Sequence, residues 1–271
     1  MKKLIYFLCI PMLLLQGCSS DSDNNDNNNN NNGSSTILCK SIRFNESDAT
    51  NVRNYRDEYI YVGDKLSEIK SYYNDVLGGK SLGFYTGDLI TEAKSYNELN
   101  RLDGNTVYKY NNSGQLIESI YYDEGILDVR DTYTYNQNGT IIQLTYYNYQ
   151  QRETLEKNST FTYTNGDLVK IDVIEYDGAQ VYNNQTITYL YDDKNSPFKN
   201  VHSSSKKILI GYYGFAQPCG NNHNVIKETV INSNPNISNS TINYQYIYNS
   251  DNYPTKQTLS NSNSSIVECT Y

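Results

Sequence analysis

Residues 108–117 read Tyr-Lys-Tyr-Asn-Asn-Ser-Gly-Gln-Leu-Ile, and this stretch decides the fold because close copies of it recur along the chain. Residues 133–142 read Tyr-Thr-Tyr-Asn-Gln-Asn-Gly-Thr-Ile-Ile, and residues 161–169 read Phe-Thr-Tyr-Thr-Asn-Gly-Asp-Leu-Val. Alternation puts the aromatic rings on one face of a β-strand, while Gly and Asn accept the positive φ of a tight turn. Each copy therefore predicts one β-hairpin.

Further copies extend the repeat over most of the chain. Their turns fall at positions 63, 87, 114, 139, 166, 195, 223 and 252. At Asn195 and Asn252 a proline follows two residues later, which predicts longer turns that lead into a strand. A meander of some fifteen strands must curl or close. We predict an all-β fold, an antiparallel meander of about eight Tyr-rich hairpins that forms either a strongly curved open sheet or a closed barrel.

Composition and charge support this fold and exclude some partners. The 271 residues include 29 Tyr and no Trp, and residues typical of strands and turns dominate over helix formers. The formal net charge is -8 at pH 7. An acidic chain repels phosphate backbones and anionic headgroups, so we expect no nucleic-acid partner and no electrostatic binding to membranes.

The first residues predict export and anchoring. Lys2 and Lys3 precede an apolar run at residues 4–15, which is typical of a secretory signal peptide. Residues 15–18, Leu-Gln-Gly-Cys, resemble the lipobox of bacterial lipoproteins, which implies cleavage after residue 17 and acylation of Cys18 with diacylglycerol and palmitate. The lipid anchor makes the membrane a partner.

The predicted domains are a signal peptide at 1–17, a lipidated Cys with an Asn-rich tether at 18–35, and a repeat domain at 36–271. The tether has few apolar residues to bury and an r.m.s. span of roughly 20 Å. Acidic residues at 21 and 23 resemble the surface-export signal of Bacteroidota lipoproteins. We therefore predict the cell surface of the outer membrane, with the periplasmic leaflet as the alternative.

The pattern of the repeat resembles that of known protein families. The pattern Tyr-x-Tyr-Asn/Asp-x-x-Gly-x-Leu resembles the YD repeat of large bacterial surface and toxin-shell proteins. With the lipobox, the tether and the stretch 191–198, Tyr-Asp-Asp-Lys-Asn-Ser-Pro-Phe, the chain is similar to uncharacterised Bacteroidota surface lipoproteins. Those proteins contain a domain of unknown function with a porin-like β-fold, so the resemblance implies that fold and no activity.

Few residues are candidates for chemistry. His202 and His223 lie in polar stretches and are expected to be solvent-exposed turn residues rather than catalytic bases or zinc ligands. Asp192, Asp193 and Asn195 cluster oxygen atoms, which favours ordinary turn chemistry over a weak calcium site because the EF-hand pattern is incomplete. We predict no catalytic residue, no metal site and no cofactor.

Adjacent tyrosines are the candidate ligand contacts, because neighbouring positions place rings on both faces of a strand. The candidates are Tyr121, Tyr122, Tyr146, Tyr147, Tyr149, Tyr212 and Tyr213. Packing of the rings inside the sheet or barrel is the alternative interpretation.

Three cysteines remain once Cys9 leaves with the signal peptide and Cys18 takes lipid. They are Cys39, Cys219 and Cys269, and an exported protein favours one disulfide and one thiol. Cys39 and Cys269 fall in the first and last strands, so a bond between them requires a closed sheet. We rank this pairing first, ahead of the other two and of an intermolecular bridge.

Three classes of function follow. The first is a non-catalytic surface lipoprotein that binds a glycan, peptide or protein partner. The second is a structural or envelope-assembly module with no small ligand. The third is an extracellular hydrolase, which needs two carboxyl groups roughly 5 to 9 Å apart in a cleft.

Overall fold

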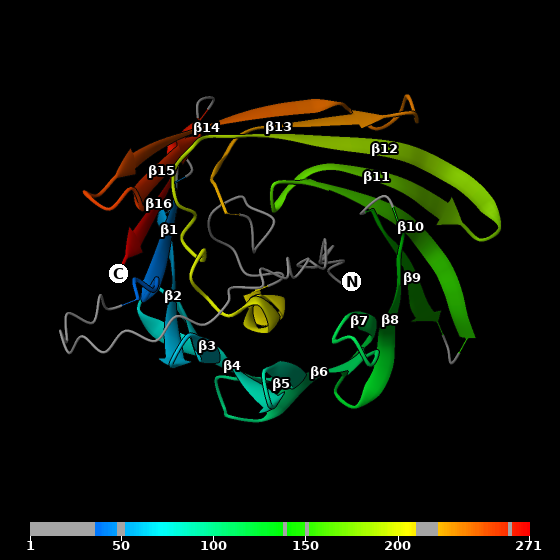
Figure 1. Cartoon of the computed structure of the whole chain (residues 1–271), viewed down its shortest axis with the longest axis horizontal. Coiled ribbons are helices and arrows are strands. Elements are labelled where there is room, and N and C mark those ends of the chain that lie inside the picture. Colours follow the sequence, from blue (N-terminus) through cyan, green and yellow to red (C-terminus); the bar gives the residue numbers. More distant parts are fainter. Residues whose placement is uncertain (1–35, 48–51, 138–139, 150–151, 210–221, 260–261) are drawn as a thin grey trace, which may run out of the picture.

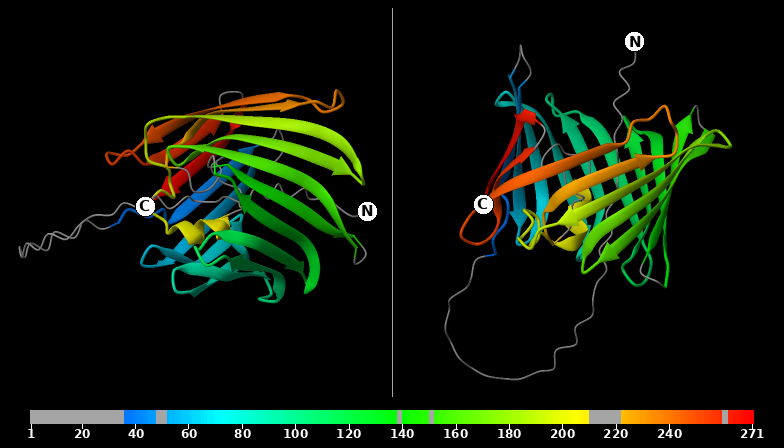
Figure 2. Two further views of the ribbon diagram at one scale, coloured as in Figure 1. Left: turned by 45° about the vertical axis from the view of Figure 1, so that its right-hand side comes forward. Right: turned by 90° about the horizontal axis from the view of Figure 1, so that it is seen from above.

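The computed structural model describes residues 36–271 except 48–51, 138–139, 150–151, 210–221 and 260–261. Within this part of the chain, sixteen antiparallel strands form a closed barrel (Figures 1 and 2), in which consecutive strands pair and β1 also pairs with β16. The strands are β1 (Ser41–Ser47), β2 (Val52–Val62), β3 (Lys65–Tyr73), β4 (Val76–Thr86), β5 (Leu89–Asn97), β6 (Leu102–Tyr110), β7 (Leu116–Asp123), β8 (Ile126–Tyr135), β9 (Ile141–Tyr149), β10 (Arg152–Thr164), β11 (Asp167–Asp177), β12 (Gln180–Tyr191), β13 (Val225–Asn232), β14 (Ser240–Tyr248), β15 (Pro254–Leu259) and β16 (Ser262–Thr270). The predicted all-β meander is confirmed, and the sheet closes into a barrel.

The helical content of the described residues is small. One 3-10 helix, η1 (Ser203–Leu209), lies inside the ring of strands (Figure 1). Among the described elements, none is a helix with the length and hydrophobicity to cross a bilayer.

The predicted turns and sidedness are confirmed at most hairpins. Gly63 and Gly114 have φ of 64° and 75°, and Asn252 takes the same left-handed region with φ of 63°. Tyr59 lies opposite Ile69 and is buried, and its ring contacts that of Phe198 inside the barrel. The Tyr-bearing face of the strands is therefore the inner wall.

Two of the predicted hairpins are wrong. The turns expected at Asn195 and His223 both fall between β12 and β13. The described residues there, 192–209 and 222–224, lie inside the ring of strands, and we call them the luminal segment. β12 and β13 pair directly, with Tyr191 opposite Val225, and the described residues between Pro197 and β13 contain no return strand. Pro254, in contrast, begins β15 as predicted.

The luminal segment sits at one end of the barrel. His202 N donates to the Asp64 carbonyl over 2.9 Å, and Ser204 Oγ donates to the Asp88 carbonyl over 2.6 Å. Both acceptors belong to hairpin turns at the end where the described chain begins. We call this the proximal end, and we call the opposite end, with the turns at 74–75, 98–100, 124–125 and 178–179, the distal end.

Tyrosine hydroxyls join successive hairpins at the proximal end. The β5–β6 ladder ends at Glu92 and Val107, and three residues later the Tyr110 hydroxyl donates to the Ile90 carbonyl over 2.7 Å. The same arrangement recurs from Tyr85 to Leu66 (2.6 Å), Tyr135 to Leu116 (3.0 Å), Tyr191 to Leu168 (2.5 Å), Tyr246 to Val225 (2.7 Å) and Tyr271 to Pro254 (2.9 Å). Each phenol satisfies a carbonyl beyond the end of the backbone ladder, which explains a tyrosine at this place in the repeat.

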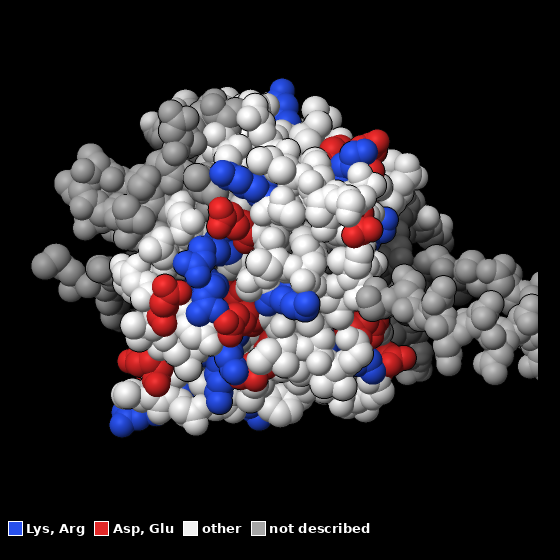
Figure 3. Space-filling view, turned by 90° about the vertical axis from the view of Figure 1, so that its left-hand side faces the viewer, with Lys and Arg blue, Asp and Glu red and all other residues white. Residues whose placement is uncertain are grey.

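The outer wall is charged. Arg56 and Glu58 alternate along β2 with the inward Asp57 and Tyr59, and both signs are interspersed over the face that carries β1 and β2 (Figure 3). Ion pairs on this wall and its rims join Arg43 to Asp75, Arg56 to Glu58, Lys94 to Glu92, Lys109 to Glu118, Arg130 to Glu153 and Lys170 to Asp172. Such a surface is suited to water.

Candidate functional site

A row of mostly polar side chains crosses the inner wall from β6 to β12. Each member lies opposite the next in the strand register. The row consists of Tyr108, Ser119, Asp131, Thr145, Lys157, Glu175 and Asn183, and we call it the polar row. A parallel row nearer the proximal end is apolar and buried, with Ile141, Phe161, Ile171 and Ile187 in register. The inner wall is thus apolar toward the proximal end and polar beyond it.

Asp131 is the centre of a buried hydrogen-bond network in the polar row. Its carboxylate accepts hydrogen bonds from Thr145 Oγ1 (2.7 Å), Gln143 Nε2 (2.7 Å) and Ser119 Oγ (3.3 Å). Burial raises the pKa of Asp131, while the hydrogen bonds from Thr145 and Gln143 act in the opposite direction. The carboxylate is therefore held in one position by its neighbours.

The polar row continues through an ion pair to β13. Lys157 Nζ lies 3.5 Å from Glu175 Oε1, and both side chains are partly exposed. Asn183 Nδ2 donates to Glu175 Oε2 over 3.0 Å and to Asn232 Oδ1 over 2.9 Å. The row therefore offers a carboxylate, an ammonium group and amides to the barrel interior.

The structure places two of the predicted tyrosines beside the polar row. Tyr121 lies opposite Val129, and Val129 lies opposite Tyr147, one row nearer the distal end. The Tyr121 ring covers Gly104, where an added Cβ would come within 2.8 Å of it. Tyr121 and Tyr147 therefore face the interior from the same row.

The other predicted tyrosines lie elsewhere. Tyr122 and Tyr146 face the outer wall, where the Arg130 guanidinium stacks 4.6 Å from the centroid of the Tyr146 ring. The Tyr149 side chain, Tyr212 and Tyr213 lie outside the described part of the chain. Ligand contact at any of the seven tyrosines stays a prediction.

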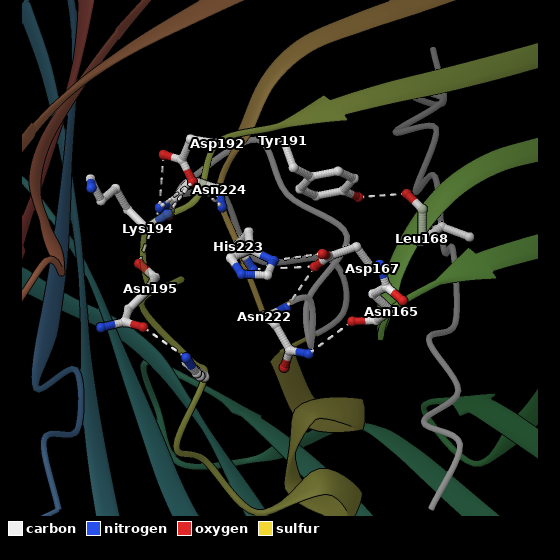
Figure 4. A network of polar contacts seen from close by, with 11 residues as sticks. Asn165, Asp167, Leu168, Tyr191, Asp192, Lys194, Asn195, Asn222, His223 and Asn224 are labelled. Carbon is white, nitrogen blue, oxygen red and sulfur yellow. Dashed lines mark hydrogen bonds and ion pairs between the residues drawn. The ribbon is translucent and has the colours of Figure 1, made fainter. Parts of the chain in front are cut away.

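Both histidines lie in the luminal segment and are half-buried, whereas solvent-exposed positions were predicted. His223 Nδ1 lies 2.7 Å from Asp167 Oδ2, and Asp167 Oδ1 accepts hydrogen bonds from the backbone of His223 (3.2 Å) and Asn222 (2.9 Å) (Figure 4). Asp167 begins β11 and is buried. His223 thus attaches the luminal segment to the barrel wall.

The acidic cluster that begins at Asp192 has a similar structural role. Its carboxylate accepts hydrogen bonds from the Asn224 backbone (3.1 Å), the Lys194 backbone (3.0 Å) and the Tyr248 hydroxyl. These donors occupy the oxygen atoms that a calcium ion would need. In the described ranges there is no group of three or more His, Cys, Asp and Glu side chains that could hold a metal ion.

Asp57 and Asp131, two of the buried aspartates, do not form a hydrolase pair along the wall. Asp57 is on β2 and Asp131 is on β8, six strands away, which corresponds to roughly 29 Å along the wall at the usual strand spacing. A glycosidase needs a separation of roughly 5 to 9 Å. Burial raises the pKa of Asp57 to about 6, against an opposing hydrogen bond from Ser71.

Closure of the barrel brings two predicted cysteines together. Cys39 Sγ lies 3.2 Å from Cys269 Sγ, both side chains are buried, and both are free thiols in this structure. Cys18 and Cys219 lie outside the described residues, so acylation and any pairing of Cys219 stay predictions.

The polar row is the feature that sequence reasoning missed. Alternation indicates which residues face inward, but the alignment of side chains across strands depends on register. The register shifts at bulges, as between Leu155 and Lys157. The sequence contained one signal for the polar row, because the polar residues at inward-facing positions could have been identified in each hairpin in turn.

The sequence matches no protein-family model and no curated protein. Among solved structures, the fold is similar to that of a porin-like protein from Bacteroides vulgatus, with a TM-score of 0.56, 13% identity, and coverage of 87% of this chain and 98% of the other. A porin-like protein from Bacteroides uniformis gives a TM-score of 0.52 with 14% identity over 86% and 97% of the two chains. The chain therefore has the fold of porin-like Bacteroides proteins, as the resemblance in the repeat pattern implied.

Proposed function

We propose that this chain is a lipid-anchored, non-catalytic protein of the outer-membrane surface that binds a glycan on the inner wall of its barrel. The observation that carries the proposal is the pairing of two rows, one with the Tyr121 and Tyr147 rings and one with the polar row. Sugars have hydroxyl groups at their edges and C–H groups on their faces. Phenol rings beside fixed carboxylate, ammonium and amide groups match both features.

The position of the chain's entry into the barrel supports an orientation. The Tyr61 hydroxyl, two residues before the Gly63 turn, donates to the Cys39 carbonyl over 2.8 Å, so the chain enters the barrel at the proximal end. A tether from an acylated Cys18 would hold this end nearest the membrane. The distal mouth, which is closer to Tyr121 and Tyr147, would then point away from the cell.

A glycan array with the mature chain, followed by titration of any hit, tests the binding proposal. Tyr147→Ala is expected to weaken binding about tenfold or more, which corresponds to about 1.4 kcal/mol. Tyr146→Ala is the matched control, because it removes the neighbouring ring from the outer wall of the same strand and is expected to bind normally. Equal effects of the two substitutions would contradict the inner-wall site.

The anchor and the location need their own measurements. Mass spectrometry of the membrane fraction is expected to find diacylglycerol and acyl chains on Cys18, and Cys18→Ser is expected to release the protein into the soluble fraction. Proteolysis of intact cells is expected to degrade the protein. Complete protection would favour the periplasmic leaflet.

The buried network favours a second candidate, a structural or envelope-assembly module with no small ligand. Asp131 and Thr145 of the polar row and the neighbouring Gln143 are each less than 10% exposed and bond to one another, so this network also serves to hold the wall together. The absence of binding on the glycan array, together with capture of envelope proteins by cross-linking, would support this candidate over the first.

A further inference from the structure

The barrel closes at a seam between the first and last strands. β1 pairs with β16 from Ser41 opposite Thr270 to Glu46 opposite Ser265. β1 is a strand of seven residues, and the described chain enters it directly from the N-terminal side. The seam therefore joins residues more than 200 positions apart at the point where the proposed tether reaches the barrel.

Two buried cysteines lie at the proximal end of this seam. Cys39 precedes β1 and is 0% exposed, and Cys269 of β16, opposite Ile42, is 6% exposed. Their Sγ atoms are 3.2 Å apart, so a movement of about 1.2 Å brings them to the length of a disulfide bond. Leu66 and Val267 belong to the same buried cluster, so the two thiols face each other in an apolar environment.

We propose that Cys39 and Cys269 form a disulfide that closes the barrel covalently where the tether enters it. The two thiols lose two protons and two electrons, which reduce a disulfide donor of the cell envelope to its dithiol. The reaction passes through a mixed disulfide, from which the second cysteine displaces the donor. The exported location predicted from the signal peptide is one where such donors act.

The environment of the thiols sets the order of events. Burial raises the pKa of the Cys39 thiol, and the adjacent Cys269 raises it further. The thiolate is the attacking species, so the closed barrel reacts slowly. Oxidation therefore takes place while the seam is forming, before the apolar cluster covers the sulfur atoms.

The bond changes how tension on the tether reaches the barrel, a consequence that rests on the proposed lipid anchor. Without the bond, tension on residues 36–40 acts on the ladders of β1. With the bond, the tension passes through Cys39 to Cys269 as well, and β1 is protected from being peeled away. The covalent bond itself does not depend on the anchor.

Peptide mapping tests the bond directly. The full chain is produced by export, its free thiols are alkylated under denaturing conditions without reductant, and the digest is analysed by mass spectrometry. The expected result is a linked peptide pair that contains residues 39 and 269, with Cys219 alkylated. Alkylation of both Cys39 and Cys269, or a link from Cys219 to either one, would overturn the proposal.

Thermal melting tests whether the bond stabilises the closed barrel. The double variant Cys39→Ser, Cys269→Ser is expected to melt roughly 5 to 15 °C below the parent protein, because the bond closes a loop of more than 200 residues. Cys219→Ser is the matched control and is expected to melt like the parent. If the double variant does not fold, reduction of the folded parent provides the same comparison. An unchanged melting temperature after verified reduction would refute the stabilising role.

Discussion

The tyrosine hydroxyls at the proximal end predict the stability of single-atom variants. Tyr110→Phe removes one oxygen atom and keeps the ring in place. The Ile90 carbonyl, which belongs to a residue that is 0% exposed, then loses a 2.7 Å hydrogen bond in a region that water does not reach. A buried acceptor left without its donor costs about 1 to 3 kcal/mol, which in a domain of this size lowers the melting temperature by roughly 3 to 8 °C.

A double variant and an outer-wall control make this test specific. Tyr135→Phe removes the equivalent bond to Leu116 two strands away, about 10 Å along the wall, so the two losses are expected to add within about 0.5 kcal/mol. Tyr146→Phe alters a phenol on the outer wall and is expected to change stability by less than about 0.5 kcal/mol. Denaturant unfolding of the parent protein and the four variants measures these differences. If Tyr110→Phe unfolds like the parent protein, the hydroxyl does not secure the end of the ladder and the explanation of the repeat is wrong.

Three further predictions concern the interior. Burial raises the pKa of Asp57 to about 6 from an ordinary value near 4, so folding takes up a proton, and the free energy of unfolding falls by roughly 2 to 3 kcal/mol as the pH rises from 4 through 6. Urea unfolding midpoints measured against pH are expected to show this decline in the parent protein and to lose it in Asp57→Asn. The same decline in Asp57→Asn would contradict its assignment to Asp57. Ser205→Ala removes the hydroxyl that accepts a hydrogen bond from the buried backbone N–H of Leu66. Amide hydrogen exchange in η1 is expected to accelerate about tenfold. Unchanged exchange protection would show that Ser205 does not hold the luminal segment. Gly104→Ala is expected to displace the Tyr121 ring and weaken glycan binding. Gly78→Ala, whose added Cβ would lie 3.6 Å from its nearest atom, is expected to bind normally. The same glycan affinity in both variants would exclude Tyr121 from the site.

The sequence predicts the local unit well because its physical causes are local. Alternating rings determine the inner face, and residues such as Gly63 and Asn252 supply the left-handed turn backbone. Cross-strand pairs such as Tyr59 with Ile69 fix the register inside each hairpin. These features need only the residues within one repeat, and they are confirmed.

The luminal segment could not be predicted from the same signals. The spacing between the turns expected at Asn195 and His223 is that of an ordinary repeat, so periodicity does not distinguish a hairpin from a long excursion. The difference arises from tertiary contacts, because Asp192 bonds to Asn224 across the base of the segment and Asp167 bonds to His223. Such contacts join residues more than 30 positions apart, and no local pattern records them.

The candidate site could be predicted from the sequence only in part. Alternation predicts that Tyr121 and Tyr122 face opposite sides, and they do. The register of β7, β8 and β9 then decides that Tyr121 and Tyr147 share a row beside Asp131. The sequence therefore identifies candidate rings, and the barrel selects which of them can act together.

The two faces of the wall indicate how this barrel can be held at a membrane. A barrel embedded in lipid needs an apolar outer band, and a basic side chain at mid-membrane costs about 2 to 4 kcal/mol. Here the outer wall carries Arg56, Lys94 and Arg130 with their acidic partners, while the buried rings and aliphatic side chains of the core lie inside. Embedding this wall would cost far more than its scattered apolar side chains could offset. The porin-like fold is thus combined with a charged outer wall, and the proposed attachment to a membrane would need a separate device, which acylation of Cys18 would supply.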